Sequence, residues 1–147
     1  MASLTKETNP KDAVGIKKAP ASTVSALVIQ ELGVAMLEGG RKYGRHNYRV
    51  SGVRASVYYD AARRHLDAWF EGQDIDPDSG LSHVTKAIAS LVVLRDAQIN
   101  NKQIDDRPPG LDDEQMYAFQ ADLQDAVNKV FEKYPESKEA FVRCQKK

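Results

Sequence analysis

The stretch VRASVYYDAARRHLDAWFE, residues 53–71, repeats apolar side chains at the spacing of an α-helix. The apolar positions are Val57, Ala61, Ala62, Leu66 and Trp69. The opposite face carries charged side chains, among them Asp60 and Arg64, whose i,i+4 spacing supports a helix. One apolar and one charged face predict an amphipathic helix that packs on other helices.

Three further segments around this stretch also have helical periodicity. Residues 24–39 follow the candidate caps Ser22 and Thr23 and end at Gly39-Gly40. The segment of residues 79–101 begins near its candidate caps, Asp78 and Ser79. The last helix begins at Asp112 and ends before Pro135, and we expect a short helical tail from Ser137. We find no convincing strand. The sequence therefore predicts an all-α protein, a compact bundle of about four helices.

The segment before the first helix has a different composition from the rest of the chain. Residues 1–22 are polar, contain two prolines and four lysines, and show no periodicity, so we expect an extended basic arm. Residues 23–147 then form a single helical domain. The 24–39 helix is apolar on most of its surface, which predicts a homo-oligomer. The alternative is that the last helix of the same chain covers it.

Composition excludes several classes of protein. The 147 residues include 21 basic and 21 acidic side chains, but residues 1–70 hold 11 basic and 6 acidic ones, and the second half is acidic. A zero net charge argues against a partner that is a nucleic acid polymer. No apolar run is long enough to span a membrane. Cys144 is the only cysteine, which rules out an internal disulfide, and we expect a cytoplasmic protein.

Two loops concentrate groups that bind nucleotides. Residues 39–49 combine basic, aromatic and amide side chains between glycines, so Lys42 is a candidate for phosphate and Tyr43, His46 and Asn47 for a base. Residues 71–80 contain four carboxylates, which suit Mg²⁺ or Mn²⁺. The simpler interpretations are a solvated basic loop and a polar turn that caps the following helix.

Four polar residues lie within the predicted helices. His65 interrupts the apolar face of the 53–71 helix, where a lone histidine is more often a core residue than a ligand. His83 and Lys86 share one face of the 79–101 helix, beside the acidic loop. Glu31 interrupts the apolar face of the 24–39 helix, and a buried carboxylate needs a partner or a metal.

Several motifs together resemble a known family. They are Asn9-Pro10-Lys11-Asp12, Lys17-Lys18-Ala19-Pro20, residues 42–48 (KYGRHNY), residues 64–69 (RHLDAW) and residues 74–83 (DIDPDSGLSH). Over roughly residues 9–99 the chain resembles the phage-associated dATP/dGTP diphosphohydrolase family, N-terminal domain. The resemblance implies an all-α protein that acts on, or binds, purine deoxynucleotides, related to the MazG-type pyrophosphohydrolases that use Mg²⁺. The paired acids of those enzymes occur here only as Glu136-x-x-Glu139 and Glu71-x-x-Asp74, in a different order and context.

Our leading hypothesis is a metal-dependent pyrophosphohydrolase that cleaves dATP or dGTP to the monophosphate and pyrophosphate, in the host cytoplasm if a phage encodes it. The catalytic candidates are Glu31, Asp60 and His65. The phosphate-binding candidates are Lys11, Lys17, Lys42, Arg64 and Lys86, and the base-binding candidates are Tyr43, His46 and Asn47. The candidate ligands of Mg²⁺ or Mn²⁺ are Asp76, Asp78 and His83. The alternatives are a protein that sequesters a host signalling nucleotide without cleaving it, and a purely structural protein.

The position of the two loops adds a prediction about assembly. If the second and third helices form a hairpin, the basic and acidic loops lie at opposite ends of the 53–71 helix, about 25 Å apart at 1.5 Å per residue. A site that uses both loops then needs a neighbouring subunit or the N-terminal arm. We therefore expect sites near subunit interfaces of a homo-oligomer.

Overall fold

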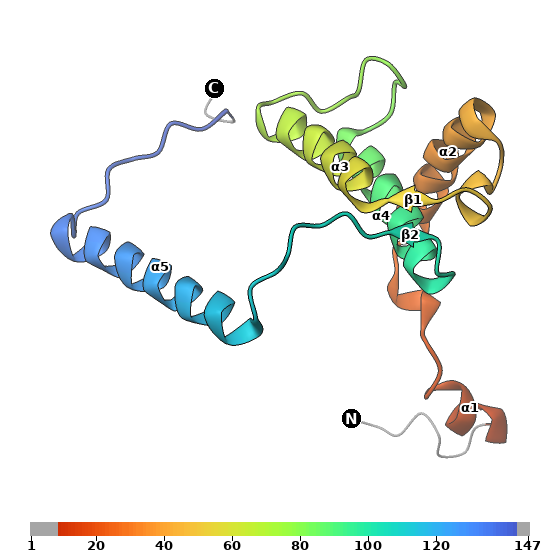
Figure 1. Cartoon of the computed structure of the whole chain (residues 1–147), viewed down its shortest axis with the longest axis horizontal. Coiled ribbons are helices and arrows are strands. Elements are labelled where there is room, and N and C mark those ends of the chain that lie inside the picture. Colours follow the sequence, from red (N-terminus) through yellow and green to blue (C-terminus); the bar gives the residue numbers. More distant parts are fainter. Residues whose placement is uncertain (1–8, 144–147) are drawn as a thin grey trace.

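Three helices form the packed part of the chain in the computed structural model, which describes residues 9–143 (Figure 1). They are α2 (Ala26–Tyr43), α3 (Ala55–Phe70) and α4 (His83–Ile99). α3 and α4 lie side by side, and α2 packs on α4. The prediction of a mostly helical protein is confirmed. Cys144 lies outside the described residues.

Two short strands, which the sequence did not predict, connect the ends of two helices. β1 (Val53–Arg54) pairs in parallel with β2 (Gln103–Ile104), and the amide of Val53 donates to the carbonyl of Lys102 at 2.9 Å. β1 leads into α3 and β2 follows α4, so this pair ties the start of one helix to the end of the other. Val53 is 1% exposed and is the largest side chain that is fully buried among the described residues.

Helix α2 begins and ends later than predicted. Its N-cap is Ser25, whose hydroxyl accepts from the Val28 amide. The helix continues through Gly39-Gly40 to Tyr43, because glycine inside a helix costs only about 1 kcal/mol and does not by itself end it. The chain turns at Gly44, where φ is 95°, a conformation that glycine adopts without strain.

Helix α4 begins at His83, four residues after Ser79, the later of the two predicted caps. Ser82 is the N-cap and accepts from the amides of Val84 and Thr85. The preceding residues are used by a turn instead, since Ile75 and Ser82 form an isolated antiparallel bridge. The predictions of Asp78 or Ser79 as the cap are therefore wrong.

The N-terminal segment is more structured than predicted over its described part. α1 (Pro10–Gly15) is a short helix, and η1 (Ala21–Thr23) is a single 3₁₀ turn. Asn9 caps α1 by accepting from the Lys11 amide, and Pro10 suits the first helical position. Both elements are exposed, and α1 lies away from the packed helices (Figure 1).

Helix α5 (Asp113–Lys133) begins where predicted, because Asp112 accepts from the Gln115 amide. No residue of α5 is buried, so its predicted buried face is exposed, and α5 does not cover α2. The linker with Pro108-Pro109 leads it away from α2–α4 (Figure 1). Residues 137–143 form no α-helix. η2 (Asn47–Arg49) completes the elements of the described chain.

Small side chains fill the contacts between the helices, and many large ones stay exposed. Ala35, Ala62, Ala87 and Ala97 are buried. Residues of the predicted apolar face such as Leu66 and Trp69 are 40% and 44% exposed. None of the described helices combines the length and the apolar character that crossing a membrane requires.

Candidate functional site

A cavity of about 790 Å³ lies between the second half of α2, the loop that follows it, and α3 and α4. Its size falls within the usual range for pockets that bind small molecules. The loop side of the wall contains Tyr43, His46, Asn47 and Tyr48. The helix side contains Tyr58, His65, Lys86 and Ser90. Residues that are far apart in the sequence thus meet around one cavity.

The loop side of the cavity has the chemistry of a base-binding surface. Tyr43 is 71% exposed, and the rings of His46 and Tyr48 pack edge to face with centroids 6.2 Å apart. Aromatic faces stack on bases, and the amide of Asn47 both donates and accepts hydrogen bonds. The structure places all three predicted base-binding residues on this wall, and their role stays a prediction.

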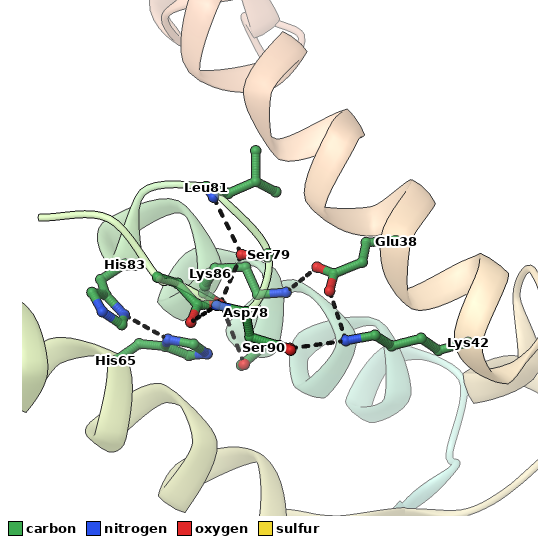
Figure 2. A network of polar contacts seen from close by, with 10 residues as sticks. Glu38, Lys42, His65, Asp78, Ser79, Leu81, His83, Lys86 and Ser90 are labelled. Carbon is green, nitrogen blue, oxygen red and sulfur yellow. Dashed lines mark hydrogen bonds and ion pairs between the residues drawn. The ribbon is translucent and has the colours of Figure 1, made fainter.

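Four charged side chains form a network (Figure 2), and Lys86 is the member of this network that lines the cavity. The carboxylate of Glu38 binds Lys42 Nζ at 2.6 Å and also binds Lys86 Nζ. Lys42 Nζ lies 3.4 Å from Asp78 Oδ2. Hydrogen bonds from Lys42 and then Lys86 lower the pKa of Glu38, and the bond to Glu38 raises the pKa of Lys42. One carboxylate thus holds two phosphate-binding candidates side by side.

This contact corrects the predicted separation of the basic and acidic loops. Lys42 belongs to the last turn of α2, and that turn lies beside the start of α4, so it reaches Asp78 within one chain. At the other end of the loop, Arg49 makes a bidentate ion pair with Asp96 on α4, at 2.8 and 2.9 Å. The chain between these two contacts follows α4. The predicted separation of about 25 Å between the basic and acidic loops is therefore wrong. No second subunit is needed to bring Lys42 to Asp78.

Asp76 organises the acidic loop. It is 9% exposed, and its carboxylate accepts from Ser79 Oγ at 2.7 Å and from the Asp78 amide at 3.2 Å. Burial alone would raise the pKa of Asp76, but these hydrogen bonds and the nearby His65 lower it below its usual value. Asp76 is therefore an ionised carboxylate that holds a turn.

Two histidines lie in contact beside this turn. His65 Nδ1 is 2.9 Å from His83 Nδ1, and His83 Nε2 is 2.8 Å from Gln73 Oε1. His83 is buried, whereas His65 is half-buried and lines the cavity. Burial lowers the pKa of His65, while the charge of Asp76 acts in the opposite direction. His65 is thus favoured as a neutral ring.

The predicted metal ligands do not converge. Within residues 9–143, no three histidine, aspartate or glutamate side chains are grouped so that they could hold a metal ion. Asp78 is paired with Lys42, and both ring nitrogens of His83 have partners. These donors do not fit a metal centre held by the protein alone. A requirement for Mg²⁺ or Mn²⁺ stays a prediction.

Other candidates lie away from the cavity. Glu31 is half-buried on α2, two turns before Glu38, and Asp60 and Arg64 are exposed on α3. Lys11 and Lys17 lie in the exposed N-terminal segment. None of these five side chains lines the cavity. Their proposed roles are untested, but the structure does not bring them together with the other candidates.

Sequence reasoning missed two polar residues that this region uses. Glu38 contacts both lysines, and its i,i+4 spacing to Lys42 was a signal available in the sequence. Gln73 binds a histidine ten residues later in the chain, and only the turn around Asp76 brings them together. No local pattern in the sequence reveals that contact.

Comparisons with known proteins identify the family of this chain. The family described as dATP/dGTP diphosphohydrolase, N-terminal, matches residues 8–107, and the chain belongs to this family. A relative from Salmonella phage PMBT28, described as "dATP/dGTP diphosphohydrolase", is 30% identical over 90 residues. The aligned region covers 61% of this chain but only 30% of the relative. No solved structure matches the chain.

Proposed function

We propose that the cavity binds a purine deoxynucleoside triphosphate, dATP or dGTP, and that the protein hydrolyses it to the monophosphate and pyrophosphate. The observation that carries this proposal is the composition of the cavity lining, which combines aromatic and amide side chains with the ammonium group of Lys86. The family and the phage relative support the same substrate class.

Each side of the cavity has a distinct role in this proposal. The base stacks on Tyr43 or His46, and Asn47 binds its edge. The phosphates lie toward Lys86 and Lys42, whose ammonium groups are held together by Glu38. Flexible lysine side chains that share one carboxylate can turn toward an incoming triphosphate, which carries more negative charge than Glu38 alone.

The reaction requires a proton acceptor for the attacking water. The water oxygen forms a bond to the α-phosphorus while the bond from that phosphorus to the bridging oxygen breaks, and pyrophosphate leaves. The proton of the water passes to a base, for which His65 is the candidate that lines the cavity. Mg²⁺ or Mn²⁺, bound to the triphosphate, would neutralise part of its charge.

A product assay tests hydrolysis directly. The protein is incubated with each of the four deoxynucleoside triphosphates, with Mg²⁺, with Mn²⁺ and with a chelator, and the products are separated by ion-exchange chromatography. We expect dAMP or dGMP with pyrophosphate, a loss of turnover in His65→Asn, and normal turnover in Gln98→Asn on the exposed face of α4. An absence of product with every nucleotide and metal contradicts the proposal.

Binding without cleavage is the second candidate. It is favoured by the pairing of Glu38 and Asp78 with lysines, which leaves neither carboxylate free to activate water. In that case the protein sequesters a nucleotide, such as a signalling nucleotide of the host. Calorimetry with linear and cyclic nucleotides, followed by chromatography of the recovered ligand, separates the two candidates, because a sequestering protein returns its ligand intact.

Self-association is part of the proposal. Many large apolar side chains of α2 and α5 are exposed in the single chain, for example Leu27 at 77% and Phe119 at 59%. A homo-oligomer would bury this surface. Light scattering at several concentrations should give a mass above 16.3 kDa, whereas a monomer at all concentrations contradicts it. A phage origin like that of the relative would place the protein in the cytoplasm of the infected cell.

A further inference from the structure

Three side chains form a chain of hydrogen bonds from the acidic loop to the cavity. Gln73 Oε1 lies 2.8 Å from His83 Nε2, and His83 Nδ1 lies 2.9 Å from His65 Nδ1. The second nitrogen of the His65 ring is on the side away from His83 (Figure 2). His65 is the member of this chain that lines the cavity.

The order of donors and acceptors in this chain follows from its first member. Gln73 faces His83 with its amide oxygen, which only accepts, so with the amide in this orientation Nε2 of His83 carries the hydrogen that Gln73 receives. In a neutral imidazole the other nitrogen is then an acceptor, so Nδ1 of His83 accepts from Nδ1 of His65. His65 is thereby left with an unprotonated Nε2.

The surroundings favour a neutral ring for His65. His83 is 4% exposed, and its Nδ1 is the partner of His65 Nδ1. Burial lowers the pKa of His65, and the charges of Lys86 and Arg64 act in the same direction. Asp76 is the nearby anion that opposes them and would stabilise a proton once His65 Nε2 has accepted it.

We propose that Gln73 and His83 are positioning residues that fix His65 in the tautomer whose Nε2 lone pair is available to the cavity. The catalytic use of that lone pair rests on the proposed hydrolysis. In the proposed hydrolysis, Nε2 of His65 takes one proton from the attacking water as the bond between the water oxygen and the α-phosphorus forms. Nδ1 keeps its hydrogen bond to His83 throughout, so the relay transfers no second proton.

Nitrogen NMR of histidine tests the tautomer without reference to activity. The chain has only three histidines, so ¹⁵N-histidine labelling gives few signals, and His46→Asn and His65→Asn assign them. In the wild-type protein we expect His65 to show an unprotonated Nε2 and a protonated Nδ1. The opposite tautomer overturns the proposal, whatever the protein does to nucleotides.

Two variants test the positioning role. Gln73→Met removes the acceptor from an exposed residue, so we expect a mixture of His65 tautomers, and Gln98→Met on α4 is the matched control. His83→Asn offers an amide oxygen at about the place of Nδ1, so it should retain the wild-type tautomer of His65. An unchanged His65 tautomer in Gln73→Met contradicts the assignment of Gln73.

Kinetics separate positioning from a structural role. If the wild-type protein hydrolyses dATP or dGTP, kcat of Gln73→Met should fall at least about threefold with KM almost unchanged, and His83→Asn should be less affected. Equal kcat values for wild-type and Gln73→Met contradict the proposed catalytic use of the His65 Nε2 lone pair. If the wild-type shows no turnover, the proposed hydrolysis fails, and this catalytic use fails with it, while the NMR result decides the tautomer independently.

Discussion

Replacing Lys86 with methionine removes one positive charge from the cavity wall and keeps a side chain of similar length. The Lys86 side chain is 17% exposed, and its ammonium group binds Glu38. A hydrogen bond to a charged group contributes about 1.5–3 kcal/mol, and about 1.4 kcal/mol corresponds to a tenfold change in affinity. We therefore expect Lys86→Met to weaken binding of dATP or dGTP by about 10-fold to 100-fold.

Isothermal titration calorimetry measures this loss, and two further variants define its cause. Arg95→Met removes a cation from the exposed face of the same helix and should leave the affinity unchanged. Lys86→Met leaves Glu38 with Lys42 alone, so adding Glu38→Gln should restore part of the affinity by removing a carboxylate that repels phosphate. An affinity of Lys86→Met within about twofold of wild-type refutes the reasoning, provided that thermal unfolding shows a folded variant.

Three further predictions concern stability. Val53→Ala should lower the free energy of unfolding by about 2 kcal/mol in urea titrations, because it removes two methyl groups from a fully buried position. Ser82→Ala should cost about 1 kcal/mol by the same measurement, since it removes the N-cap of α4. The hydrogen bond from Arg49 lowers the pKa of Asp96, so this pair stabilises the fold above about pH 4, the unfolded value, and is lost as the pH falls through the folded pKa. The difference in urea midpoint between wild-type and Arg49→Ala should therefore shrink from pH 6 to pH 3, and a constant difference contradicts it.

The helices were predictable because their signals are local. Periodicity located α2 to α5, and Asp112, the predicted start of the last helix, is the N-cap of α5. The ends of α2 and the start of α4 were not predictable in the same way. Gly39-Gly40 continue the helix because packing on α4 offsets the cost of glycine, and Ser82 replaces the earlier caps because Asp76 binds Ser79 in a turn.

The residues of the candidate site were predictable from the sequence, but their arrangement in space was not. The cavity contains Tyr43, His46, Asn47, His65 and Lys86, all of which the sequence indicated. The contacts that link separate elements follow from how the helices pack, and no single helix determines them. The exposed apolar face of α5 shows the same limit, because periodicity indicates an apolar face and does not indicate what covers it.

The central claim is that this cavity binds a purine deoxynucleotide. A titration of the ¹⁵N-labelled protein with dATP and dGTP, followed by amide NMR, tests it most directly. The cavity is lined by Gly33, Gly39, Gly40 and Gly44, whereas Gly15 and Gly110 lie outside it and serve as controls in the same spectrum. The account predicts shifts of the cavity glycines with either nucleotide and unchanged control signals. Unchanged cavity glycines at saturating nucleotide, or shifts confined to residues outside the cavity, contradict it.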